Sequence, residues 1–467
     1  MKRNKQNQFL DHPKPVTRRD FLSRGTLAFS ATLFAPTLIG QILKANVKEP
    51  LKCSAAVGSN FIPMLVFDCA GGAALPGNFL VGGSGGPQDL LKSYDTLGWN
   101  PRDAGAVDTR FGLPMASKVS KILSGMLASM STEAQANFRM GSFLHASQDD
   151  SQINLTSALI LALEQGVNGS IIQRGLGTGT NFSGGNTGGA DQSASMQPIV
   201  VSSVQDVIGA VSMGPVLDLL SVQERRNLLQ AAQSMSQNQL SALAGGDIGA
   251  FGDQMSCAYQ NAASYADVGA SLDPRNDKDI SKIYQLTSST AVDSSDLISA
   301  TIVMNVLKKQ SGPGVITIAG CDYHDGSQTT GDQIDLTIGT QIGRAIESAR
   351  LLGQPLFIQI ITDGGLFAET GTRNWSGDSG DKSMTVIGYY NPKAAPKLMK
   401  PLSPQVGAYN QGQAADQSSL IGADTAKVAY ATLANYMQIN GTLSQNADVF
   451  SGQLGQNLDQ VLLFETP

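Results

Sequence analysis

The stretch GVITIAGCDYHDGSQ, Gly314–Gln328, places chemically versatile side chains directly after a strand-like run. Its apolar part, Val315–Ile318, is rich in β-branched residues and ends in Ala-Gly, which is typical of a buried strand followed by a turn. A cysteine, two aspartates, a tyrosine and a histidine follow within five residues. His324 is one of three histidines in 467 residues, and it lies two positions after Asp322. Ligands bind at the carboxyl ends of the strands in open parallel sheets, so we expect a site here.

Two other apolar runs end in the same way. FIPMLVFD ends at Asp68, and FIQIITD ends at Asp363. If the three strands are parallel neighbours, Asp68, Asp322 and Asp363 converge, and His324 lies beside them. Crowded carboxylates repel one another unless a cation neutralises them, and aspartate with histidine suits a divalent metal. We therefore expect Ca²⁺, Mg²⁺ or Zn²⁺ at this edge.

The same residues fit a structural role. An aspartate after a strand often closes a turn or caps a helix, because its carboxylate accepts hydrogen bonds from nearby backbone N–H groups. His145 follows the strand-like segment GSFLHAS, and it fits either a hydrogen-bonded core position or the lining of the site. Both alternatives stay open on the sequence alone.

Apolar runs alternate with helical patterns along most of the chain, which predicts an α/β fold: a mainly parallel sheet with helices on both faces. We assign this domain to residues 51–467, with a helical insertion at about 206–310 and an amphipathic stretch at Leu297–Leu307. The expected strands are at 61–67, 170–175, 197–203, 315–318, 354–363 and 383–390. The expected helices are at 115–130, 151–165, 331–352 and 424–439, with Ser151 as the cap of the second and Asp424 as the cap of the last.

The charge of the chain is unevenly distributed. Residues 1–50 hold nine Lys/Arg and three Asp/Glu, and the remainder holds 23 Lys/Arg and 35 Asp/Glu, a formal charge of −12. An acidic body repels polyanions, so nucleic acid is excluded as a partner. Hydrophobic residues make up 41% of the chain, enough for a large core, whereas charged residues make up only 15%.

The basic N-terminal segment contains the features of a twin-arginine export signal in the expected order. In VTRRDFLSRGTLAFSATLFAPTLIGQIL, residues 16–43, Arg18 and Arg19 precede Phe-Leu and a weakly apolar stretch. We expect the export machinery as a partner and a periplasmic or secreted location, with residues 1–50 either removed or retained as an anchor. An oxidising compartment permits disulfides among Cys53, Cys69, Cys257 and Cys321, whose pairing the sequence leaves open.

A wider resemblance begins at CDYHDGSQTTGDQIDLTIGTQIGRAIESA, residues 321–349. It is similar to the Asp-x-His segment of exported sulfatase-like proteins of unknown function in the alkaline phosphatase superfamily. FDCAGG, FIQIITDGG and QDDSQINLTSA resemble other segments of that family in the same order. The resemblance implies an alkaline-phosphatase-like fold with Asp68, Asp322, His324 and Asp363 as metal ligands. It also implies that Ser151 stands at the position of the nucleophile.

The sequence departs from the family pattern at two places. Gly364 stands where a ligand histidine would follow Asp363, and WSGDSGDKS carries Asp378 and Asp381 where family members often have a histidine. So few histidines disfavour a zinc pair and favour one cation held by oxygens. The sequence therefore predicts a degenerate relative that acts as a binding or assembly component of the cell envelope, with a protein partner. The alternative is a metal-dependent hydrolase of phosphate or sulfate esters, so enzymatic activity stays open, as does the substrate.

Overall fold

The computed structural model describes the chain in segments. The described residues are 61–85, 89–90, 107–146, 156–167, 171–174, 199–206, positions within 220–235, 272–321, 328–362, 365–368, 375–379, 383–410, 414–422, 424–455 and 458–467. Among these residues, no helix combines the length and the apolar composition that a bilayer crossing needs.

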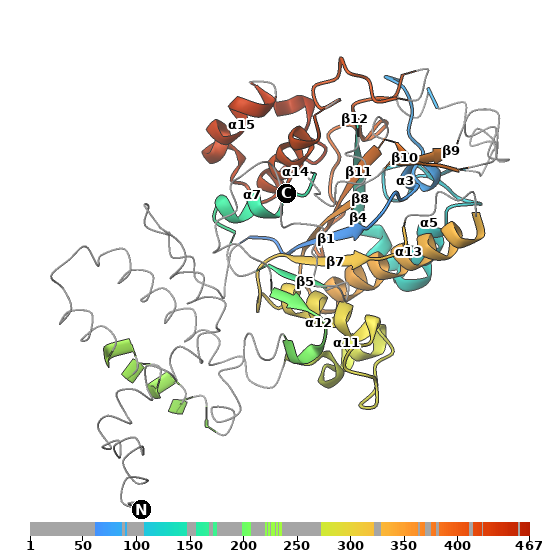
Figure 1. The fold of residues 1–467 in the computed structure, drawn as a ribbon. Coiled ribbons are helices and arrows are strands. Elements are labelled where there is room, and N and C mark those ends of the chain that lie inside the picture. The colour runs from blue at the N-terminus through green and yellow to red at the C-terminus, as the bar shows by residue number, and fades with distance from the viewer. Residues whose placement is uncertain are drawn as a thin grey trace, which may run out of the picture.

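A sheet of eight described strands forms the centre of the fold (Figure 1). Its strand order is β12-β4-β11-β8-β1-β7-β5-β6. Within this sheet all described pairings are parallel except those that β11 makes with β4 and β8. The predicted mainly parallel α/β sheet is thus confirmed. The strands are β1 (Met64–Cys69), β4 (Phe138–His145), β5 (Ile172–Arg174), β6 (Ile199–Val201), β7 (Gly314–Ile318), β8 (Leu356–Thr362), β11 (Ser383–Tyr390) and β12 (Gln405–Val406).

The central strand β1 is buried along its whole length, and its side chains alternate between the two faces of the sheet. Leu65, Phe67 and Cys69 belong to the core on one face. Met64 and Val66 belong to the core on the opposite face. Each fully buried large apolar side chain contributes about 2 kcal/mol to stability, so both faces need covering helices.

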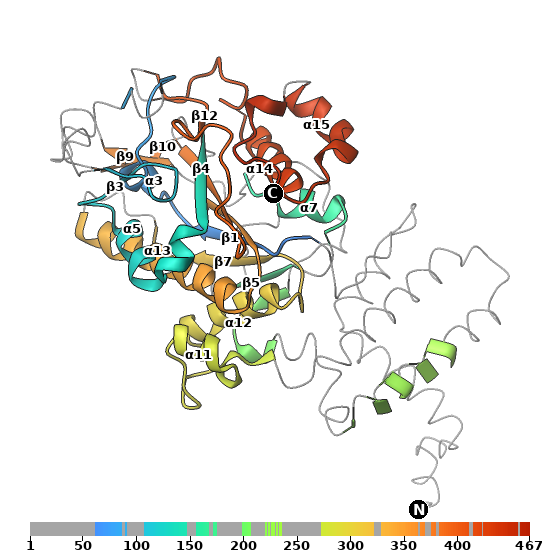
Figure 2. The same cartoon turned by 180° about the vertical axis from the view of Figure 1, so that it is seen from behind.

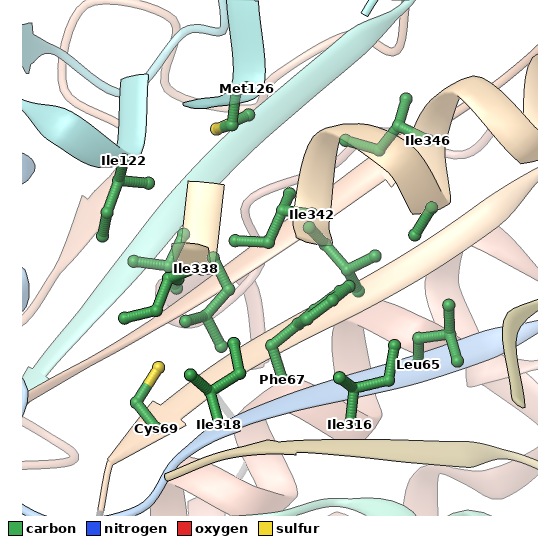
Figure 3. Packing of buried hydrophobic residues seen from close by; sticks show 14 of the residues in the cluster. Leu65, Phe67, Cys69, Ile122, Met126, Ile316, Ile318, Ile338, Ile342 and Ile346 are labelled. Atoms are coloured by element: carbon green, nitrogen blue, oxygen red, sulfur yellow. The ribbon is translucent and has the colours of Figure 1, made fainter. Parts of the chain in front are cut away.

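The first face is covered by α13 (Gln328–Leu351), α5 (Lys121–Ser129) and α12 (Ser295–Leu307), with the shorter α3 (Leu75–Asn78), α6 (Thr132–Ala136) and α11 (Lys278–Ile283) around them. Figure 3 shows Ile338, Ile342 and Ile346 of α13 lying over Phe67 of β1. The backbones of α13 and α5 approach closely because glycines lie between them: a Cβ on Gly339 would stand 2.0 Å from the carbonyl oxygen of Ile122.

The second face is covered by α14 (Thr425–Ile439), with α7 (Leu159–Glu164) and α15 (Ala447–Leu454) beside it (Figure 2). Asp424 caps α14 as predicted, since its carboxylate accepts a hydrogen bond from Ala426 N. Asn435 of α14 donates to the Val461 carbonyl and accepts from Leu463 N, which holds the end of the chain against this helix.

Smaller elements complete the described chain. They are β2 (Val107–Asp108), β3 (Met115–Ala116), β9 (Gly365–Ala368), β10 (Trp375–Ser379), and the 3-10 turns η4 (Pro274–Asn276), η5 (Leu443–Asn446) and η6 (Leu458–Gln460). β2 pairs with β3, and β9 pairs with β10, both antiparallel.

Two helical expectations differ from the structure. The helix predicted from Met115 starts only at Lys121, because Ser120 accepts a hydrogen bond from Leu123 N and sets the N-cap there. The stretch Leu297–Leu307 is buried on all sides instead of being amphipathic. The reason is that α12 packs on β7 and β5 and is covered in turn by α11 and α13. The final part of the predicted insertion therefore belongs to the layer on the sheet.

Candidate functional site

The carboxyl ends of three strands meet at one edge of the sheet. β1 lies between β7 and β8 and runs parallel to both, with Cys69 in register with Ile318 on one side and with Thr362 on the other. The shared site predicted from the sequence requires that these three strands be parallel neighbours, and they are. Asp322, His324 and Asp363, which follow β7 and β8, lie outside the described residues.

Asp68 is the predicted ligand that the structure describes. It is the fifth residue of β1, it is in register with Thr317 and Ile361, and only 1% of it is exposed. Its side chain points to the face that α14 covers, because it alternates with Phe67 and Cys69. A carboxylate fixed by a central strand beneath the edge offers an oxygen ligand of the kind that Ca²⁺ and Mg²⁺ prefer.

His145 ends β4, whose carboxyl end lies at the same edge because β4 is parallel to β8 across β11. Its Nδ1 donates to the Ala146 carbonyl at 2.5 Å, and its Nε2 accepts from Thr385 Oγ1 at 3.0 Å. Complete burial lowers the pKa of His145 to about 4, against the opposing effect of the Ala146 hydrogen bond. The imidazole is therefore neutral at physiological pH, and both of its nitrogens are engaged by the protein.

The strand order separates His145 from Asp68. Three strand spacings lie between β4 and β1, a distance of at least about 14 Å. His145 is thus far beyond the reach of a metal ion bound to Asp68. It occupies the hydrogen-bonded core position that the sequence leaves as one of its alternatives.

The other candidate residues fall where the structure says less. Asp378 lies on β10, which comes between β8 and β11 in the sequence. Asp381, Ser151, Arg18 and Arg19 lie outside the described residues. β11 begins at Ser383, opposite His145, so the chain that carries Asp378 leaves the edge after β8 and returns to it. Among the described residues, no three His, Cys, Asp or Glu side chains gather closely enough to hold a metal ion.

The chain after Ser151 is attached to the sheet by Gln359 of β8. Gln359 Oε1 accepts from Ala158 N at 3.1 Å, and its Nε2 donates to the Thr156 carbonyl at 2.6 Å. The helix α7 begins at Leu159 with Ala158 at its N-cap. The described part of the helix expected at 151–165 therefore begins at Leu159, because Thr156 and Ala158 bond to Gln359. Residues 151–155 lie outside the described residues.

A buried polar cluster, which the sequence patterns above do not predict, lies on the α13 side of the sheet. Asn78 Nδ2 donates to Asp335 Oδ2 at 2.7 Å, and Asn78 Oδ1 accepts from Ser120 Oγ at 2.9 Å. Only 6% of Asp335 is exposed. The signal in the sequence is a carboxylate at helical spacing before Ile338 and Ile342, that is, on the apolar stripe of its helix.

Two buried cysteines lie beside this cluster. Cys69 and Cys321 are both reduced, and their thiols are in hydrogen-bonding contact. That contact, together with burial and the negative charges of Asp335 and Asp68, holds the pKa of Cys321 well above its usual range. The Cys321 thiol therefore stays protonated at neutral pH while it remains in this environment.

Comparison of the chain with protein-family models, with curated proteins and with solved structures gave no match.

Proposed function

We propose that this protein is an exported relative of the alkaline phosphatase superfamily that holds one divalent cation at the carboxyl edge of its sheet. In this proposal it serves as a binding or assembly component of the cell envelope. The observation that carries the proposal is the parallel pairing of β7, β1 and β8. It places the strand ends that precede Asp322 and Asp363 on either side of the strand that carries Asp68.

The supply of histidines favours a single cation held by oxygens. The chain has three histidines. His12 lies in the expected export signal, and both nitrogens of His145 are engaged by Ala146 and Thr385. His324 is the remaining imidazole, whereas a pair of zinc ions needs several nitrogen or sulfur ligands. Ca²⁺ or Mg²⁺ needs only oxygens, and carboxylates at the edge supply them.

Elemental analysis of the purified full-length chain, with melting curves in Ca²⁺, Mg²⁺ and a chelator, tests this proposal. We expect about one divalent ion per chain and a higher melting temperature in the presence of the cation. Asp68→Asn should abolish the cation-dependent rise, whereas the exposed control Asp448→Asn should retain it. A wild-type chain that carries no cation and shows no cation-dependent shift would overturn the proposal, whatever the stability of the variants.

A second candidate function is hydrolysis of phosphate or sulfate esters with Ser151 as the nucleophile. One observation favours it: β4 ends at the same edge, and the chain beyond Ser151 is bound to Gln359, in the strand next to β1. Ser151 therefore lies in a connection whose two ends are both held by this sheet. A bound cation would supply Lewis-acid activation of an ester oxygen there.

The two candidate functions are separated by activity measurements on the cation-loaded chain. A hydrolase turns over an aryl phosphate or an aryl sulfate, and Ser151→Ala lowers that rate by about a thousandfold or more. A cation-loaded chain with no turnover of either ester supports the binding function and excludes the hydrolase on these substrates. The variant His145→Asn serves as a control for structural damage near the same edge.

A further inference from the structure

Two thiols face each other at the edge where β1 and β7 end. Cys69 is the last residue of β1, and Cys321 follows β7 by three residues. Both are fully buried, and the Cys321 thiol is in hydrogen-bonding contact with that of Cys69. They belong to the same core cluster as Ile318. Neither participates in the cation site proposed above.

The backbone around the two cysteines fixes their relative position. Ala70 N donates to the Ile318 carbonyl at 3.1 Å, and the Ala70 carbonyl accepts from Cys321 N at 3.1 Å. Gly320 has a φ of +82°, a conformation that glycine adopts readily, and it turns the chain so that Cys321 comes back beside β1. The Cys321 thiol also donates to the Ile318 carbonyl at 3.3 Å.

We propose that Cys69 and Cys321 form an oxidisable pair that closes to a disulfide when the protein meets a small-molecule disulfide. One thiol, after losing its proton, attacks one sulfur of the reagent and forms a mixed disulfide with it, while the other half of the reagent leaves as a thiol. The second thiol then attacks the protein sulfur of this mixed disulfide and releases the retained half of the reagent as a second thiol. Two protein thiols are oxidised and one reagent disulfide is reduced to two thiols. The protein loses two hydrogen atoms.

The backbone bonds between the ends of β1 and β7 hold the two cysteines close to each other. Residues on adjacent strands have Cα atoms about 5 Å apart, within the range that disulfides span. Cys69 is in register with Ile318, and Cys321 is bonded through its backbone to the residue that follows Cys69. Thiols already in contact need only a side-chain rotation to bring the sulfurs to bonding distance.

The disulfide would join the residue after Asp68 to the residue before Asp322. It would therefore fix the distance between two of the chain segments that approach the edge. It would also close a loop of about 250 residues, and disulfides that close long loops restrict the unfolded chain most strongly. The oxidised protein should consequently resist heat better than the reduced one.

Mass spectrometry of the wild-type, full-length protein tests the pairing. The folded chain is incubated with glutathione disulfide or with dithiothreitol, denatured in an alkylating reagent and digested. We expect a Cys69–Cys321 cross-linked peptide after the oxidant and two alkylated peptides after the reductant. The proposal is overturned if both cysteines remain fully alkylated after prolonged oxidation. It is also overturned if they pair instead with Cys53 or Cys257.

Melting curves provide a second measurement that depends on the same pair. Oxidation should raise the melting temperature of the wild type by roughly 3 °C or more. Cys69→Ala and Cys321→Ala should each remove that rise, whereas the control Cys257→Ala should keep it. These measurements are made without added cation, so a failed disulfide and a failed cation site give separate results. An oxidation-dependent rise that persists in both cysteine variants would contradict the proposal.

Discussion

Asn78 donates a hydrogen bond to Asp335 at 2.7 Å, although 257 residues of chain separate them. The same amide accepts from Ser120 Oγ and from Ile122 N, so one side chain joins α3, α5 and α13. All of these bonds are buried. The Asn78 side chain therefore stabilises the packing of α3, α5 and α13 near the carboxyl edge of the sheet.

Replacing Asn78 with alanine should lower the free energy of unfolding by about 2–4 kcal/mol. The change removes four buried hydrogen bonds, one of them to the Ala74 carbonyl, and takes the amide donor away from the carboxylate of Asp335. Denaturant unfolding followed by circular dichroism measures the loss. The control Asn391→Ala removes one exposed bond, to Lys393 N, and should cost less than about 1 kcal/mol. Equal losses in both variants would contradict the supporting role of Asn78.

The contact between α5 and α13 should not tolerate a methyl group at Gly339. Alanine favours a helix by about 1 kcal/mol, but here its Cβ would collide with the backbone of Ile122. We expect Gly339→Ala to destabilise the protein by about 2 kcal/mol or more. The matched control is Gly452→Ala in α15, where nothing lies within 4 Å of the added atom. This control should be neutral or stabilising in the same thermal and denaturant melts.

Burial of His145 should make stability depend on pH in a defined window. In the folded protein the pKa of the His145 imidazole is about 4, whereas in the unfolded chain it has its ordinary value of 6.5. Between these values the unfolded state binds more protons, so the free energy of unfolding falls as the pH drops from 6.5 towards 4. The loss amounts to about 3 kcal/mol at most. Above pH 6.5 this contribution is fully present.

The variant His145→Asn isolates that contribution, because asparagine does not titrate. Stability differences between wild type and variant, measured by urea unfolding at several pH values, should shrink as the pH falls through the window. Carboxylates that titrate in the same range affect both proteins alike and cancel in the difference. A difference that is constant from pH 7 to pH 4 would show that His145 does not resist protonation.

Gln359 should position the chain that follows Ser151. Gln359→Met keeps the volume but removes the hydrogen bonds to Ala158 N, the Thr156 carbonyl and Thr432 Oγ1. We expect a loss of about 2–3 kcal/mol and faster hydrogen exchange at the Ala158 amide. The half-buried Gln438, on α14, provides the control Gln438→Met. Unchanged exchange at Ala158 in Gln359→Met would rule out this positioning role.

The positions of the strands could be predicted because buried strands leave a strong local pattern. The strands predicted at 315–318, 354–363 and 383–390 correspond to β7, β8 and β11 of the central sheet. Their direction left no such pattern, since a strand buried on both faces has the same composition whether it runs parallel or antiparallel. β11 is antiparallel to both of its neighbours, and periodicity alone could not have shown this.

The candidate site could be predicted only in part. Asp68 follows from the strand that carries it, and the neighbouring positions of β7, β1 and β8 follow only from the folded sheet. The bond between Asn78 and Asp335 depends on the packing of distant segments, so no short motif marks it. For His145, the sequence allows either a hydrogen-bonded core position or a place in the lining of the site. The hydrogen bond that identifies the core position comes from Thr385, which lies 240 residues away in the sequence.

The reversed direction of β11 has an evolutionary consequence. Thr362 ends β8 and Ser383 begins β11, and both lie at the same rim of the sheet. The twenty residues between them, 363–382, therefore leave the sheet and return to it at two adjacent strands. Such a segment can be lengthened, shortened or exchanged between descendants while the eight-strand framework stays intact. New binding specificities could thus evolve through changes in this one segment, with no change in the hydrophobic core.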